Sequence, residues 1–122
     1  MEHQLNVHLF LLKLKHDLKD GGLLVLTVPP YNTNRSKIVD GHLTAWNSGF
    51  LIYNLVVAGF DCSDIKIKQY DYNISVILRK EEIQVPELAY GSGDMEKLKP
   101  YAPDFFVSGY SANLKEYNWE DL

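Results

Sequence analysis

The sequence predicts an α/β fold: a partial sheet with one strand of the parallel type and an antiparallel hairpin, flanked by helices and followed by an irregular tail. Three observations support this prediction. Segment 23–28 is an apolar run between two glycines and two prolines, which is typical of a strand buried on both faces. Segments 4–20 and 47–58 carry apolar residues at helical spacing. Segments 65–70 and 74–79 read as strands too close together for a crossover.

The first predicted helix, residues 4–20, is amphipathic. Its apolar residues recur at intervals of three and four positions: Val7, Leu11, Leu14 and Leu18. Leu9 and Leu12 widen the apolar arc, which indicates neighbours on more than one side. Gly21 suits the left-handed conformation that ends helices. The strand 23–28 then follows directly.

A long loop, residues 29–46, leaves the carboxyl end of that strand. Loops of this length in compact domains are usually functional or disordered. Open α/β sheets bind their ligands at the carboxyl ends of the strands. The loop is therefore the predicted location of a site.

The second helix is predicted to begin at Asn47 or Ser48 and to end at Ala58. Gly59 is the expected left-handed residue after it, and Phe60 is expected to pack back on Leu55 in a Schellman motif. The hairpin follows, with its turn at residues 71–73.

Composition narrows the class of protein. The chain has 122 residues, 46% hydrophobic and 23% charged, which fits one globular domain. A net charge of -4 gives no reason to expect nucleic acid or an anionic membrane as partner. The single cysteine, Cys62, excludes an internal disulfide and fits a reducing, cytoplasmic location. No apolar run reaches the roughly 18 residues of a membrane span, and no secretory signal is visible.

The chain changes character after residue 80. Residues 1–80 hold nine Lys/Arg and seven Asp/Glu, whereas residues 81–122 hold three and nine. The second segment is thus an acidic extension, but it keeps many aromatic residues, unlike a typical disordered tail. We expect it to wrap the domain or to dock on a partner, with a short helix at residues 94–98.

Three segments, in this order and spacing, resemble one family. They are Asp17-Leu18-Lys19-Asp20-Gly21-Gly22 with the strand to Pro29, Gly41-His42-Leu43 with Trp46, and Ala58-Gly59-Phe60. Together they resemble the carboxyl-terminal half of a class I S-adenosylmethionine-dependent methyltransferase, over residues 4–80. The resemblance implies that segment 23–28 is the fifth strand of a Rossmann-like sheet and that the hairpin is its last two strands. The bacterial members that act on sugars or surface polysaccharides look most similar, which implies a small-molecule or saccharide acceptor.

The chain departs from that family in its cofactor motifs. The family holds S-adenosylmethionine through a glycine-rich loop after its first strand and an acidic residue after its second, and this sequence has neither. The resemblance therefore implies a fragment or a truncated form that carries the acceptor side, binds no cofactor alone and is inactive alone. The alternative is a non-catalytic interaction or dimerisation module derived from a methyltransferase.

The candidate site residues lie in the loop. His42 is the candidate general base, since imidazole titrates near neutrality; a loop-fixing hydrogen bond is the structural alternative. The candidates for acceptor binding are Tyr31, Asn32, Arg35 and Trp46. The alternatives are turn residues for Tyr31 and Asn32 and a solvated loop for Arg35. The spacing of His3, His8 and His16 does not match a helical metal site, so no metal is predicted.

The missing half of the sheet has a physical consequence. Without it, strand 23–28 has the hairpin on one side and no neighbour on the other. A bare apolar edge invites pairing with a second chain. We therefore expect a homodimer built across the exposed edge of strand 23–28.

Overall fold

The computed structural model describes residues 1–31, 37–109 and 114–120, and it confirms the α/β class. In these residues the elements are α1 (Val7–Asp17), β1 (Leu23–Val28), α2 (Ser48–Val57), β2 (Lys66–Tyr70), β3 (Asn73–Arg79), α3 (Asp94–Leu98), a 3-10 turn (Lys99–Tyr101) and β4 (Glu116–Tyr117). The strands form one sheet in the order β1-β3-β2-β4. The hairpin of β2 and β3 is confirmed.

Every strand pair of this sheet is antiparallel. β1 pairs with β3 from Leu23 opposite Arg79 to Val28 opposite Ile74. The expectation that segment 23–28 is a strand of the parallel type is therefore wrong for the pairing observed. β1 and β2 do run in the same direction, but β3 folds back between them, so the two never meet. The parallel pairing found in the described chain is the isolated bridge from Pro30 to Trp46.

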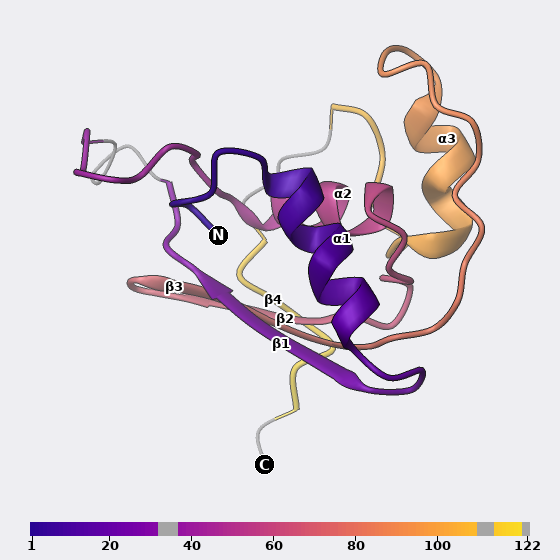
Figure 1. Ribbon diagram of the computed structural model, residues 1–122, viewed down its shortest axis with the longest axis horizontal. Helices are drawn as coiled ribbons and strands as arrows, with labels where there is room; N and C mark the ends of the chain where they lie inside the picture. Colours follow the sequence, from indigo (N-terminus) through magenta and orange to yellow (C-terminus); the bar gives the residue numbers. More distant parts are fainter. Residues whose placement is uncertain (32–36, 110–113, 121–122) are drawn as a thin grey trace.

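The sheet is covered on one face. Figure 1 shows α1, α2 and α3 on the same side of the strands. Along β1 the side chains alternate: Leu24 and Val28 are buried, whereas Leu23 and Val25 are 54% and 64% exposed. The prediction that this strand is buried on both faces is therefore wrong. The reason is that no helix within the described ranges packs on the second face, which we call the open face.

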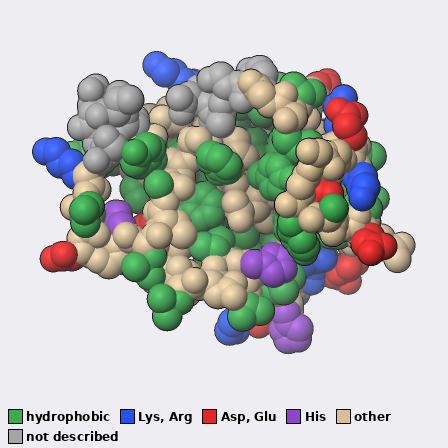
Figure 2. Space-filling model, turned by 90° about the horizontal axis from the view of Figure 1, so that it is seen from above, with side chains coloured by type: hydrophobic (Ala, Val, Ile, Leu, Met, Phe, Trp, Pro, Cys, Tyr) green, Lys and Arg blue, Asp and Glu red, His purple; other side chains and the backbone are tan. Residues whose placement is uncertain are grey.

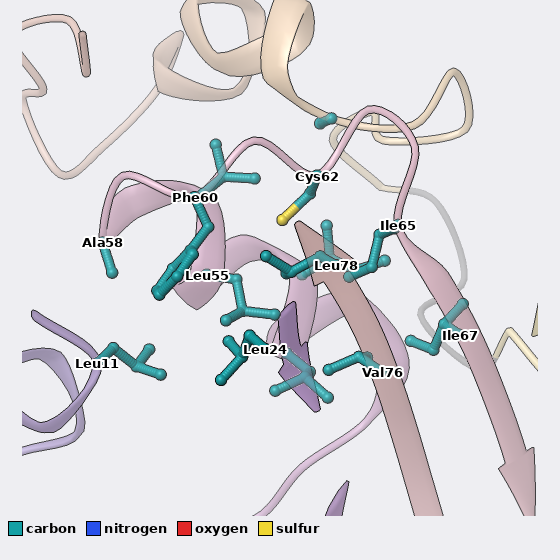
Figure 3. Close-up of a cluster of buried hydrophobic side chains, with 14 of the residues drawn as sticks. Leu11, Leu24, Leu55, Ala58, Phe60, Cys62, Ile65, Ile67, Val76 and Leu78 are labelled. Atoms are coloured by element: carbon teal, nitrogen blue, oxygen red, sulfur yellow. The ribbon is translucent and has the colours of Figure 1, made fainter. Parts of the chain in front are cut away.

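The hydrophobic core lies between the covered face and the helices. Leu11 of α1, Leu55 of α2 and Leu24 of β1 converge in it, and Phe60 and Val76 pack beside them (Figure 3). Each fully buried side chain of this size contributes about 1.5–3 kcal/mol relative to exposure. The buried positions on the strands are those that face the helices, which fixes the register of the sheet.

The first helix is shorter than residues 4–20. Asn6 caps it by accepting a hydrogen bond from the backbone N–H of Leu9 at 3.0 Å, and Leu18 already has extended backbone (φ -78°, ψ 139°). Gly21 has the predicted positive φ, 72°, and its N–H donates to the carbonyl oxygen of Lys80 at 2.8 Å. The chain thus leaves the helix early to reverse direction into β1.

The end of the second helix follows the prediction. Asn47 caps α2, and its side chain accepts from the N–H of Phe50 at 2.8 Å. Gly59 has φ 93°, and the N–H of Phe60 donates to the carbonyl oxygen of Leu55 at 3.0 Å. This is the hydrogen bond that defines the Schellman motif, so the motif is confirmed.

The described part of the acidic extension packs on the same core. The predicted helix at residues 94–98 is present as α3, and Leu98, Ala102 and Phe106 belong to the hydrophobic cluster. The Asp94 carboxylate accepts from the N–H groups of Ala89 and Gly91 at 3.0 and 3.2 Å, and the bond from Ala89 is the main cause that lowers its pKa. The short strand β4 was not predicted; it pairs with β2.

None of the described helices is both long enough and apolar enough to cross a membrane.

Candidate functional site

The loop after β1 is closed at its base. Pro30 and Trp46 form the isolated parallel bridge, and the N–H of Tyr31 donates to the carbonyl oxygen of Trp46 at 2.6 Å. Between them the structure describes residues 37–45. The loop therefore starts and ends at one point, at the carboxyl end of β1, which is where the sequence predicted a site.

The candidates for acceptor binding do not all have the same surroundings. Tyr31 is 55% exposed beside the base of the loop, whereas Trp46 is only 3% exposed and belongs to the hydrophobic core. Asn32 and Arg35 lie outside the described residues. The Trp46 Nε1 and the Thr44 Oγ1 are buried without a hydrogen-bond partner among the described residues, so two polar atoms of this loop are left unsatisfied there.

His42, the candidate general base, lies beside two residues from the start of the chain. Its ring meets the ring of His3 edge-on, with the centroids 4.8 Å apart and the planes at 87°. The His3 Nε2 lies 3.4 Å from the Glu2 Oε1. One ligand atom from each of Glu2, His3 and His42 lies within 4.8 Å of the other two. We call these three residues the His–His–Glu cluster.

No sequence pattern predicts this cluster. Residues 2 and 3 precede the first helix, whereas His42 follows the first strand, so the contact depends on the path of the chain and not on a local spacing. What the cluster can do follows from its donors. Two imidazoles and a carboxylate can transfer a proton, or they can bind a transition-metal ion.

A second feature lies at the other end of β1. A cavity of about 270 Å³ opens beside the start of that strand; its lining includes Leu23, Asp61, Asp64, Lys66, Ile77 and Arg79. It is therefore separated from the predicted ligand end of the sheet by the length of β1, and no sequence motif pointed to it.

Cys62 is not a candidate nucleophile. It is fully buried, and burial raises the pKa of its thiol far above the ordinary value. A buried thiol of this kind remains protonated and unreactive.

Comparison with protein families, curated proteins and solved structures finds no match for this chain. The methyltransferase resemblance therefore stays a prediction, and it enters below as part of a proposal.

Proposed function

We propose that this chain is the acceptor-side half of a cytoplasmic class I methyltransferase-like domain and is completed by a second polypeptide segment added along β1. The observation that carries the proposal is the exposed apolar edge of the molecule at β1. In the family that the sequence resembles, the fifth strand pairs on both sides. Here β1 pairs with β3 on one side, and no described strand lies on the other.

Several apolar side chains around that edge are exposed. Leu23 and Val25 are more than half exposed on the open face. On α1, Leu9 and Leu12 are 61% and 39% exposed, and Leu5, just before the helix, is 95% exposed. β1 and α1 are drawn nearest the viewer in Figure 1, at the same edge of the molecule. Exposed apolar side chains on both sides of one sheet edge make that edge a candidate interaction site.

The helix-bearing side supports the same conclusion. Figure 2 shows hydrophobic side chains gathered over its centre, with charged side chains distributed toward the rim. In the residues that the structure describes, the covering layer is α1, α2 and α3. A further helix beside α1 would bury the exposed leucines of that helix, as neighbouring helices do in complete α/β sheets.

The motifs present and absent in this chain indicate which part of the site each polypeptide would supply. The glycine-rich loop and the acidic residue that hold S-adenosylmethionine in the family would come from the added segment. This chain would supply the loop at the carboxyl end of β1, where an acceptor such as a saccharide would bind. Catalysis in the completed domain would be an in-line methyl transfer, driven mainly by positioning.

A second candidate function is a non-catalytic module that pairs with its own copy. The observation in its favour is that β1 contains no charged residue, although charged side chains are the usual protection of an edge strand. Two copies could therefore pair along β1 without bringing like charges together. The same edge serves both candidates, and the occupant distinguishes them.

The deciding experiment is native capture of the tagged chain from its own cells, followed by calorimetric titration of the captured species with S-adenosylmethionine. The purified chain, titrated alone at about 100 micromolar to reveal weak binding, serves as reference. We expect saturable one-to-one binding by the captured species and none by the chain alone. Captured material that never binds the cofactor would contradict the methyltransferase proposal.

Two substitutions sharpen this experiment. Val25→Lys places a charge on the open face beside the bare edge, where it should remove both the added segment and the cofactor binding. Ile38→Lys is the matched control, because Ile38 is fully exposed in the loop and belongs to no strand. Sedimentation at micromolar concentration tests the second candidate: a wild-type chain that sediments as a monomer excludes the homodimer.

A further inference from the structure

We propose that the His–His–Glu cluster is a binding site for a divalent transition-metal ion of the zinc class. The donor set is the starting point. Glu2, His3 and His42 each present one ligand atom, and the three atoms lie within 4.8 Å of one another. Two imidazoles with one carboxylate are an established zinc donor set in proteins, with water in the remaining position.

The distances suit a site that closes on its ion. Zinc binds imidazole nitrogen at about 2.0–2.1 Å and carboxylate oxygen at about 2.0–2.2 Å, so tetrahedral donors lie about 3.3 Å apart. The His3 Nε2 is already 3.4 Å from the Glu2 Oε1. The side chain of His3 is 55% exposed, and His42 is also exposed, so the rings are free of the core and can rotate inward.

The backbone holds the two segments together independently of these side chains. The N–H of Leu43 donates to the carbonyl oxygen of Glu2 at 2.7 Å, directly beside His42. The N–H of His42 donates to the carbonyl oxygen of Val39 at 3.0 Å and closes a turn. Backbone hydrogen bonds therefore hold together the two segments that carry the ligand side chains.

Gly41 makes the close approach possible. Its φ is 81°, in the region that favours glycine, and a Cβ at this position would lie 2.9 Å from the His3 Nδ1. A Cβ at position 41 would therefore force the His3 ring to shift. Glycine at this turn leaves room for the ring in its observed position.

Metal binding assigns His42 a role different from that of a base. A ring nitrogen that donates its lone pair to a metal ion cannot at the same time take a proton from the hydroxyl or amine of a methyl acceptor. The ion would instead pin the segment before α1 to the loop after β1 and so order one side of the predicted acceptor region. This inference does not depend on the methyltransferase proposal, because it concerns the chain alone.

The test is calorimetric titration of the chelator-treated chain with Zn²⁺, without an affinity tag and in a buffer that does not bind metal. We expect one ion per chain. His42→Ala and His3→Ala should each weaken binding at least about tenfold, and Glu2→Gln should weaken it less, because the amide oxygen still donates. Co²⁺ should give visible absorption bands of a tetrahedral site in the wild type and lose them in His42→Ala.

His8→Ala and His16→Ala are the matched controls, because both histidines are exposed on α1 and outside the cluster. Both controls should bind Zn²⁺ as the wild type does. The proposal is overturned if no saturable binding occurs up to about 1 millimolar Zn²⁺, the weak end of specific affinities. It is equally overturned if His42→Ala keeps full affinity, since the ion would then be held by groups at the start of the chain without the loop.

Discussion

The two faces of the same strands differ in what covers them. On β1, Leu24 is 6% exposed and contacts the core beneath the helices, whereas its neighbour Val25 is 64% exposed on the open face. Both are apolar, and both belong to one strand. The chain thus carries apolar residues on the open face that its own described fold does not bury. The difference identifies the open face of β1 as apolar surface that a partner could cover.

The largest expected effect is on the covered face. Leu24→Ala removes buried methyl groups from a core whose neighbours are held by the sheet, and we expect it to lower the free energy of unfolding by about 2–5 kcal/mol. Urea denaturation followed by circular dichroism measures this change. A loss below about 1 kcal/mol, the usual range of exposed sites, would show that the covered face is not a packed core.

The next prediction concerns the acidic extension. Leu98 of α3 is fully buried in the same cluster, so Leu98→Ala should cost about 2–4 kcal/mol, nearly as much as a change in the sheet. The variant should still unfold in one transition at a lower urea midpoint. If residues 81–122 were an independent appendage, the main transition would stay at its wild-type midpoint.

A smaller effect is expected at the cap of the helix that lies over the covered face. Asn47→Ala removes the acceptor of the Phe50 N–H and should cost about 1 kcal/mol. Asn47→Asp keeps a side-chain oxygen at that position and should retain most of the stability. Thermal unfolding of the three proteins compares them directly, and equal losses in both variants would mean that the cap is not what Asn47 contributes.

The sequence predicted most local structure and less of the tertiary structure. The end of the second helix could be predicted from Ala58-Gly59-Phe60 alone. A glycine with positive φ and an apolar residue after it define the Schellman motif locally. The hairpin likewise followed from two short strands with a tight turn. The second-face burial of segment 23–28 was wrong because an apolar run does not say whether a second layer is present.

The candidate site shows the same limit. The loop was predicted from its length and its place after the strand, and its base is closed by Pro30 and Trp46. The contact of His42 with Glu2 and His3 was not predicted, since it joins segments on either side of α1 and β1. Only the path of the chain through the fold brings these residues together, and no spacing rule describes it.

The smallest expected effect is on the open face, and it tests the difference between the two faces directly. Val25→Thr keeps the β-branched shape and removes apolar character on the open face, so in a dilute monomer it should change stability by less than about 0.5 kcal/mol. Val76→Thr is the matched change on the covered face, where Val76 is fully buried, and a hydroxyl without a partner there should cost about 1–3 kcal/mol. Urea denaturation at low micromolar protein compares the pair.

The dependence of the unfolding midpoint on protein concentration gives a second test of Val25→Thr. If a copy of the chain covers the open face, the wild-type unfolding midpoint should rise with protein concentration, and Val25→Thr should reduce that rise. If the midpoint is independent of concentration and Val25→Thr is neutral, the open face is uncovered in the isolated chain and a pairing of two copies is excluded. Equal losses for Val25→Thr and Val76→Thr at low concentration would contradict the comparison itself, because both faces would then be covered within one chain.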